Sequence, residues 1–539
     1  MGLKTTFEVF SKTKNEAAVN VLVPALESPY PQIQEGALRS ILDRRSVVGS
    51  REIVRRLHTV NDRWREILEA RRGRMSKVLR EGLLGHDPRM CTNSCQAILW
   101  FREYDLIGPL VNAVEDHAHP QAALIRETLV SMSDLLSEEA TAPRDYNDRR
   151  DPQLVRRNFV TVLEKSVSRF SQHKRVEVIE SFLMLAKRDN AQLKHILGDP
   201  HHSAYLSLID MLSHSRRLGV IRLLLSFLDD TRPPLAALQI VSKRTDPRFV
   251  QQILRMIGKE PSENVARNLK RVESIAWASP GVGILAKLDD ALQRSAVKAV
   301  MASGMPRLQA FKTIKYLLQH GKPEGRCAAI EVLVEFQGAE ANALAQKALH
   351  DDDPRVQAHA LRQIRQRGIP GALPLLIEKL DSQHAVVREA ARDSLSEFSF
   401  ARFLAGFETL DDAVRHSTGS LVKKVDLQSV SLLEAELTSK IRSRRLRGLE
   451  IVDAMDFAAE VQETLIGMLN DEDHMVRQET VYILATRNTA AVRAALTTVL
   501  DDSSPMVRAA AATALDRFNE IGIEDGSPPE DEPREVNRV

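Results

Sequence analysis

A short pattern of small and apolar residues recurs three times in the middle of the chain at a fixed step. It begins at Gly325 as Gly-Arg-Cys-Ala-Ala-Ile, at Val356 as Val-Gln-Ala-His-Ala-Leu and at Val387 as Val-Arg-Glu-Ala-Ala-Arg, so the step is 31 residues. Units of this length with helical spacing are typical of helix pairs stacked in a row, because one amphipathic pair does not bury its apolar face alone. The repeat therefore predicts an all-α fold, a right-handed α-solenoid of antiparallel helix pairs.

The same register extends to both sides of these units. Equivalent polar positions follow one another at 31 or 32 residues, first Arg294, Arg326, Gln357 and Arg388, and then Arg445, Arg477 and Arg508. Near the start, Ile33, Ala37 and Ile41 share one helix face in a further unit. The solenoid is therefore expected to occupy most of the chain.

The composition agrees with an all-α fold and indicates the cellular compartment to expect. Only 5% of the residues are aromatic and 43% are apolar, which suits packed helices. The 75 basic and 73 acidic residues give a net charge of +2, so the overall charge favours neither an acidic nor a basic partner. Three cysteines give no disulfide framework. No apolar run reaches the length of a membrane span, and residues 1–10 do not resemble a signal peptide. We expect a cytoplasmic protein without a membrane span.

The regularity of the pattern divides the chain into seven parts. They are an N-terminal repeat at 1–43, a long basic amphipathic helical insertion at 44–85, degenerate repeats at 86–290 with an exposed loop at 138–152, regular repeats at 291–397, an irregular helical segment at 398–428, C-terminal repeats at 429–520 and a disordered acidic tail at 521–539. Inside the insertion, apolar residues at helical spacing over 51–84 predict one long helix, or two helices bent near Gly73.

An aspartate and an arginine six residues apart mark two of the units. Asp471 precedes Arg477, and Asp502 precedes Arg508, in each case across the turn between two helices. This pattern resembles the HEAT-repeat family, in its short bacterial form related to the phycobilisome-lyase-like HEAT proteins. An aspartate at the turn can accept backbone N–H bonds from the next helix, and the arginine can reach the aspartate of the neighbouring unit. We therefore interpret these four residues, with Arg326 and Arg388, as structural repeat positions.

The strongest functional signal is the charge of residues 39–80. Thirteen basic residues stand against five acidic ones there. The candidate partner-binding residues are Arg55, Arg56, Arg63, Arg65, Arg71, Arg72 and Arg74. A basic amphipathic helix can contact an acidic protein, phosphates or an anionic membrane, but a solvated helix face is the more common origin of such a charge pattern. An acidic partner, the acidic tail of this chain and nucleic acid all stay open.

No pattern typical of catalysis or cofactor binding occurs. The sequence has no P-loop, dinucleotide fingerprint, His-Glu-x-x-His or Gly-x-Ser-x-Gly motif. Cys91 and Cys95 share a helix face, but a metal would need two more ligands, so we interpret them as small buried residues. The predicted function is a non-catalytic protein–protein interaction scaffold with an unknown partner and no cofactor. A nucleic-acid-binding solenoid is the alternative. The resemblance to HEAT proteins also brings in an enzyme of glycosylase or lyase type, which we favour less.

Overall fold

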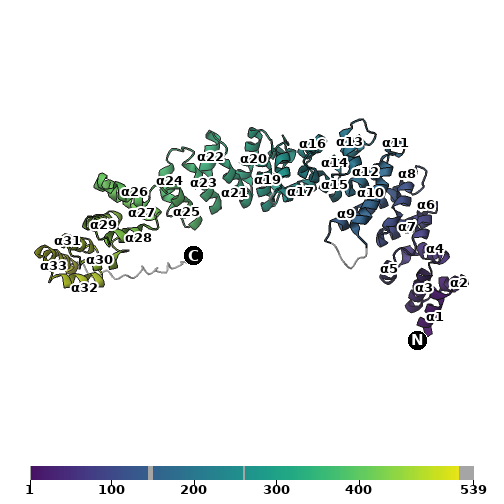
Figure 1. Cartoon of the computed structure of the whole chain (residues 1–539), viewed down its shortest axis with the longest axis horizontal. Coiled ribbons are helices and arrows are strands. Elements are labelled where there is room, and N and C mark those ends of the chain that lie inside the picture. The colour runs from purple at the N-terminus through teal and green to yellow at the C-terminus, as the bar shows by residue number, and fades with distance from the viewer. Residues whose placement is uncertain (1, 144–149, 259–260, 521–539) are drawn as a thin grey trace, which may run out of the picture. The chain divides into compact units, whose positions relative to one another are not determined.

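The computed structural model describes residues 2–143, 150–258 and 261–520, and in these residues every regular element is a helix (Figure 1). The chain divides into two units, Met1–Arg326 and Cys327–Val539. In each unit a first helix and a second helix alternate along the chain, and second helices of successive pairs pack on one another. The predicted all-α solenoid of stacked helix pairs is confirmed.

Unit 1 contains the longer series of pairs. Its first helices are α2 (Ala17–Ala25), α4 (Val47–Arg55), α6 (Ser76–Leu84), α8 (Ile107–Glu115), α10 (Pro152–Val167) with α11 (Phe170–His173), α13 (Ala191–Gly198) with α14 (Tyr205–His214), α16 (Leu235–Lys243), α18 (Glu263–Leu269) and α20 (Arg307–His320). Its second helices are α3 (Pro31–Arg44), α5 (Asp62–Glu69), α7 (Pro88–Phe101), α9 (Ala122–Thr141), α12 (Val176–Leu185), α15 (Leu218–Ser226), α17 (Pro247–Gly258) and α19 (Asp290–Ala302). Within this unit, Figure 1 shows α6, α8, α14 and α16 in one row and α7, α9, α15 and α17 in the other.

Unit 2 continues the alternation, and α21 (Pro323–Leu333) contains the division between the units. The first helices of unit 2 are α22 (Ala339–Ala348), α24 (Ala372–Lys379), α26 (Phe400–Gly406), α28 (Ser429–Leu437), α30 (Gln462–Met468) and α32 (Ala490–Val499). The second helices are α23 (Pro354–Ile364), α25 (Ala385–Ser394), α27 (Asp412–Val425), α29 (Arg442–Met455), α31 (His474–Leu484) and α33 (Pro505–Glu520). Single 3₁₀ turns join some helices: η1 (Leu57–Thr59), η2 (Tyr104–Leu106), η3 (Phe227–Asp229), η4 (Ala276–Ala278), η5 (Pro280–Val282), η6 (Leu285–Lys287) and η7 (Phe407–Thr409).

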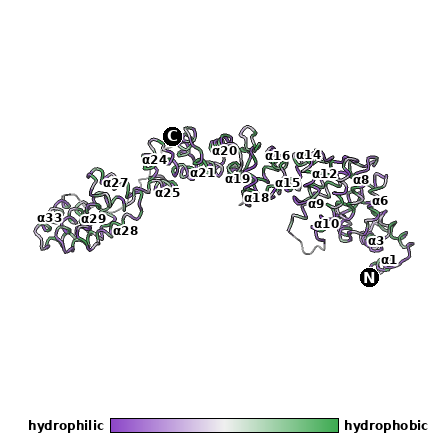
Figure 2. The backbone as a smooth tube through the Cα atoms, turned by 45° about the horizontal axis from the view of Figure 1, so that its top comes forward, coloured by the Kyte–Doolittle hydropathy of each residue, from purple (hydrophilic) through white to green (hydrophobic). Residues whose placement is uncertain are grey.

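Helix α31 shows how the sequence produces one such element. Asp473 accepts the backbone N–H groups of Met475 and Val476 at 2.9 and 3.3 Å, which satisfies two donors that the first turn of a helix leaves unpaired. Val476 and Leu484 are fully buried on one face, within the core of unit 2. Burial of one such side chain stabilises the fold by about 1.5–3 kcal/mol. Hydrophobic and hydrophilic stretches alternate in this way along both units (Figure 2).

The single long helix predicted over 51–84 is wrong, and the alternative of two helices bent near Gly73 has one break in the right place but misses a second break near Asn61. The segment forms α4, η1, α5 and α6, because two positions interrupt it. Asn61 is extended and its side chain accepts the N–H of Trp64 at 2.9 Å, so α5 starts anew there. Gly73 has a φ of +79°, in the left-handed region, and lies in the turn that separates α5 from α6, at the predicted bend. Helix α4 packs on α3 and α7, and α6 packs on α7 and α8, so these helices are members of the stack.

Two further differences concern residues outside the regular repeats. Helix α9 runs to Thr141, so residues 138–141 of the predicted loop are helical. Residues 144–149 lie outside the described residues, as does the predicted acidic tail at 521–539.

Residues 2–12, for which no element was predicted, form helix α1 (Gly2–Lys12), which packs on α3. There Ser40 Oγ donates to Phe7 O at 3.1 Å and Arg44 Nη1 donates to Phe10 O at 2.8 Å. The division of the chain into seven parts stays a prediction.

Candidate partner-binding site

Most of the arginines predicted to bind a partner already have carboxylate partners inside the fold. The ion pairs are Arg55 with Glu52 at 2.6 Å, Arg56 with Glu27 at 2.8 Å and with Glu52 at 2.6 Å, Arg63 with Glu35 at 2.5 Å, Arg65 with Glu69 at 3.2 Å, and Arg71 with Asp43 at 3.0 Å. The Arg56 side chain holds the pKa of Glu52 below its usual range. Arg72 and Arg74 flank Gly73 in the turn before α6. Much of the positive charge of this segment is therefore balanced locally, and its role in binding stays a prediction.

The arginines of the repeat pattern lie on the turns between paired helices. Each donates to the carbonyl of its own turn: Arg388 Nη1 to Ser382 O at 2.8 Å, Arg477 Nη1 to Asp471 O at 2.8 Å, Arg508 Nη1 to Asp502 O at 2.5 Å, and Arg326 Nη1 to Gly321 O at 3.1 Å. Asp471 and Asp502 also accept backbone N–H groups of their own turns, from Asp473 and Ser504. The contacts of these residues are internal to the stack.

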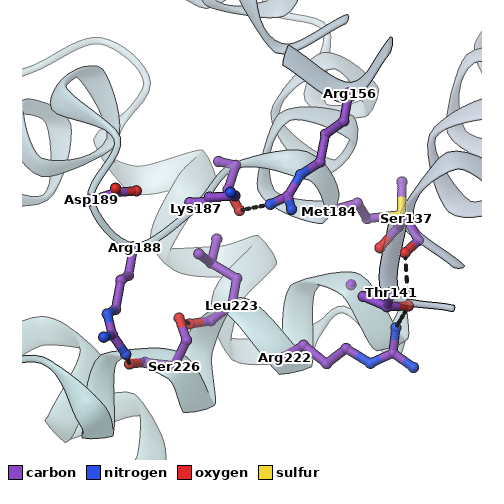
Figure 3. Close-up of a pocket in the computed structure, with 12 residues that line it drawn as sticks. Ser137, Thr141, Arg156, Met184, Lys187, Arg188, Asp189, Arg222, Leu223 and Ser226 are labelled. Carbon is purple, nitrogen blue, oxygen red and sulfur yellow. Dashed lines mark hydrogen bonds between the residues drawn. The ribbon is translucent and has the colours of Figure 1, made fainter. Parts of the chain in front are cut away.

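A different group of cations surrounds a cavity of about 460 Å³ in unit 1 (Figure 3). Helix α9 has 20 residues and α12 only 10, so α9 extends past the end of α12 and meets α15. The contact is close, since a Cβ on Gly219 would lie 2.8 Å from Ser137 Oγ and 2.9 Å from Met184 O. The cavity opens where α12 has ended, and it is lined by Ser137, Thr141, Arg156, Met184, Ala186, Lys187, Arg188, Asp189, Gly219, Arg222, Leu223 and Ser226.

Four basic side chains from three parts of the chain line this cavity, which we call the basic pocket. Arg156 on α10 donates through Nε to Leu185 O at 2.6 Å and through Nη2 to Ala186 O at 3.2 Å. Arg222 on α15 donates to Thr141 Oγ1 at 2.9 Å, as Figure 3 shows. Lys187 is exposed, and Arg188 forms an ion pair with Asp229 at 2.8 Å. Within the described residues, Arg156, Lys187 and Arg222 have no carboxylate within 4.0 Å, the distance of an ion pair.

Burial makes the charge of Arg156 less favourable. It lowers the pKa of this guanidinium, and the nearby carboxylate of Asp189 only partly offsets the effect. A second cavity of about 540 Å³ shares Arg156, Lys187 and Asp189 with the first and adds Arg157 and Glu164. Glu164 accepts a hydrogen bond from Asn190 through Oε1 at 2.6 Å and forms no ion pair with the cations of the cavity. Because Arg156, Lys187 and Arg222 have no ion-pair partner among the described residues, the adjoining cavities form a site suited to an anionic ligand.

Sequence reasoning missed this site because no regular spacing marks its residues. Arg156 and Lys187 are 31 residues apart, but Arg156 lies in the first helix α10 and Lys187 in the turn after the second helix α12, so they do not occupy equivalent positions of successive pairs. Charge summed over contiguous segments favours residues 39–80 instead.

Groups with chemical reactivity are engaged in packing. Cys91 and Cys95 are buried in α7, and the hydrogen bond between the thiols together with burial raises the pKa of Cys91. In the part of the chain that the structure describes, no three His, Cys, Asp or Glu side chains are placed to hold a metal ion. Ser166 Oγ lies 3.4 Å from His173 Nε2, the arrangement of a hydroxyl beside a possible base. His173 Nδ1, however, accepts the backbone N–H of Arg175, so the proton of the neutral ring is on Nε2. Nε2 donates that proton to Ser166 O at 3.0 Å. That tautomer is the wrong one for a base acting on Ser166.

The fold and the repeat turns define the chain as a helical-repeat protein. The family model of HEAT repeats matches residues 310–396 and 458–528, so the resemblance seen in the sequence is confirmed and the chain contains HEAT repeats. Similar solved structures include an engineered protein, 16% identical, with a TM-score of 0.17 over 93% of this chain and 98% of that chain. Kap121p bound to Nup53p is 13% identical, with a TM-score of 0.28 over 96% of this chain and 65% of that chain. The Kap95:Nup1 complex is 11% identical, with a TM-score of 0.26 over 95% and 78%. A search of curated proteins found no match. None of the described helices has the length and apolar character that crossing a membrane requires.

Proposed function

We propose that this protein is a non-catalytic scaffold that binds a protein partner, and that the basic pocket is a docking site for it. The observation that carries the proposal is the convergence of Arg156, Lys187 and Arg222 on an open cavity without carboxylate partners among the described residues. Unpaired charges at the surface of a stacked-helix array are available to a ligand, whereas charges paired within the fold must first lose their partners.

Nucleic acid is the main alternative partner, and the lining of the pocket argues against it. Proteins that bind single strands without sequence preference use aromatic side chains on which bases stack. No aromatic residue lines either of the two cavities. A HEAT-like enzyme would need reactive groups that converge on a cavity, and the basic pocket offers only cations, hydroxyls and Asp189.

Affinity capture with matched variants tests the proposal. Full-length protein is used as bait in a native lysate of the source organism, with and without nuclease, and bound material is identified by mass spectrometry. The Lys187→Glu/Arg222→Glu variant changes the pocket, and Lys298→Glu, an exposed lysine on α19, serves as the control for added negative charge. A variant with Arg55, Arg56, Arg63 and Arg65 changed to Glu tests the segment predicted from the sequence.

The outcomes separate the candidate functions. A stoichiometric protein that survives nuclease and is lost only from the pocket variant supports the proposal. If the protein is lost instead from the arginine variant while a thermal melt shows that this variant is folded, the docking site is the segment predicted from the sequence. If only nuclease-sensitive material is captured, the scaffold function is wrong and the nucleic-acid alternative takes its place.

A further inference from the structure

We infer that the basic pocket accepts an extended acidic peptide segment of the partner, whose carboxylates pair with Arg156, Lys187 and Arg222. The inference rests on the proposed function, because it assigns a chemistry to the segment that docks at the same site. Three observations carry it: the unused donors of the cations, the size and lining of the two cavities, and the position of Asp189.

The Arg156 guanidinium has capacity for a further partner. Of its five N–H donors, the structure shows bonds to two neutral carbonyl oxygens, Leu185 O and Ala186 O. Those carbonyls hold the planar group in place, but no described carboxylate lies within ion-pair distance of it, and Asp189 acts on its charge only from further away. A carboxylate at the remaining donors forms charge-assisted hydrogen bonds, which are shorter and stronger than bonds between neutral groups. Arg222 is held in a similar way by the Thr141 hydroxyl, so two cations are oriented before a ligand arrives.

The cavities are too large for a single anion and suit a peptide. Together they extend on both sides of Arg156, Lys187 and Asp189, with volumes of about 460 and 540 Å³. Apolar side chains lie among the polar ones, Met184 and Leu223 in the first cavity and Val160 in the second. An extended chain advances about 3.3 Å per residue and places alternate side chains on the same side. We therefore expect carboxylates at alternate positions to face the cations, with apolar contacts along the same strip.

Asp189 limits how dense the negative charge of the ligand can be. Its exposed carboxylate lines both cavities and lies close enough to Arg156 to influence the charge of that group. A ligand with a negative charge at every position, such as a nucleic acid, would place one of them against Asp189, and like charges in contact weaken binding. A peptide can place a neutral residue there. Removal of the Asp189 charge should therefore strengthen binding of acidic peptides.

A peptide selection tests the inference directly. A phage-displayed library of random dodecapeptides is selected on biotinylated full-length protein, with Lys187→Glu/Arg222→Glu protein for counter-selection. The selected peptides are labelled with fluorescein, and their binding to the protein is measured by fluorescence anisotropy. A twelve-nucleotide single-stranded DNA and inorganic phosphate serve as competitors. Thermal melts confirm that each variant is folded, and Lys298→Glu is the matched charge control.

The expected result is a set of peptides rich in Asp and Glu that bind the wild type and the Lys298→Glu control alike. Each single change, Lys187→Glu or Arg222→Glu, should weaken binding about tenfold, and Asp189→Asn should strengthen it about threefold. Failure to enrich acidic peptides, or equal binding to the pocket variant, overturns the inference. Displacement by the DNA at lower concentration than by unlabelled peptide also overturns it and points to nucleic acid. If these tests fail while lysate capture still loses a protein in the pocket variant, the acidic-segment inference is wrong and the proposed function stands.

Discussion

Arg477 binds two consecutive repeats at once, because it pairs with Asp502 of the following turn. Its Nε and Nη2 atoms donate to Oδ2 and Oδ1 of Asp502 at 2.7 and 2.9 Å, and both side chains are only 10% exposed. One repeat earlier, Arg445 pairs with Asp471: its Nη2 atom donates to Oδ1 at 3.0 Å and its Nε atom lies 2.8 Å from Oδ2. Each arginine also donates to a carbonyl of its own turn, Arg445 to Ser439 O and Arg477 to Asp471 O. The pairs therefore fix the spacing of successive turns in this part of unit 2.

Loss of the Asp502 carboxylate should loosen the end of the stack. Asp502→Ala leaves the largely buried Arg477 charge without its partner, which we expect to cost about 3 kcal/mol. Hydrogen exchange of the α33 amides measures the effect, because the last pair can open without the rest. The control is Arg508→Ala, since Arg508 is exposed and its guanidinium reaches only two carbonyls of its own turn. Equal loss of protection in the two variants would contradict a special role of the Arg477–Asp502 pair.

The same pair should make this region sensitive to acid. Hydrogen bonds from Arg477 hold the pKa of Asp502 below the value of about 3.9 that an unfolded aspartate has. Between the two values the unfolded chain binds more protons, so the stabilisation is complete above the unfolded pKa and is lost as the pH falls through the folded pKa. The difference in urea midpoint between wild type and Asp502→Asn should therefore shrink as the pH is lowered from 6 to 2.5. A difference that stays constant over this range would show that the charge of Asp502 does not contribute.

The repeat turns could be predicted because they depend on residues close together in the sequence. An aspartate and an arginine six residues apart span one turn, so their spacing alone places them together. The predicted long helix failed because the capping side chain of Asn61 and the left-handed backbone of Gly73 override an apolar pattern that continues across both. The basic pocket was not predictable from the sequence, since it depends on α12 being only ten residues long, and its cations come from α10, the turn after α12, and α15.

Gly36 allows α1 to pack on α3, and replacing it should release α1. A Cβ at this position would lie 2.3 Å from the Cδ2 and Cε2 atoms of Phe7, so the ring must move. Helix α1 has no buried residue, which makes its docking weak, and we expect Gly36→Ala to displace it while the rest of unit 1 stays folded. Faster hydrogen exchange confined to residues 2–12 is the expected readout.

Two controls identify the steric cause at Gly36. Gly108→Ala on α8 introduces a Cβ with no atom within 4 Å, so it should leave the exchange of α1 unchanged. Phe7→Ala removes the obstructing ring, and the addition of Gly36→Ala to that variant should have little further effect on α1. If Gly36→Ala speeds exchange equally in the presence and absence of the Phe7 ring, contact with the ring is not the reason.

Arg156 should contribute to stability as well as to binding. Arg156→Ala removes the donors from two carbonyls at the end of α12, and we expect a loss of about 1–2 kcal/mol in the free energy of unfolding. Lys187→Ala, at an exposed position of the same pocket, should change stability by less than about 0.5 kcal/mol. Chemical denaturation measures both, and a stable Arg156→Ala variant would mean that these carbonyls find other partners.

Charge reversal in residues 55–65 should disturb the fold of the N-terminal repeats more than it disturbs binding. Changing Arg55, Arg56, Arg63 and Arg65 to Glu places like charges against Glu27, Glu35, Glu52 and Glu69, where ion pairs stood. The five exposed pairs contribute about 0.2–1 kcal/mol each and like charges oppose folding by about 0.2–0.5 kcal/mol each, so the sum is about 2–7 kcal/mol.

The Gln versions of these four substitutions are the matched control, because they remove the attraction without adding repulsion. We expect the melting temperature to fall in the order wild type, Gln variant, Glu variant, with the acidic peptides of the pocket still bound below the melting range. If the Gln variant melts like the wild type but no longer captures the partner, the four arginines contact the partner and do not stabilise the fold. The segment predicted from the sequence is then the docking surface. The two results differ in their physical cause. Neutralising an arginine that forms an ion pair within the fold lowers the stability of the protein, whereas neutralising one that contacts only a ligand lowers the affinity for that ligand.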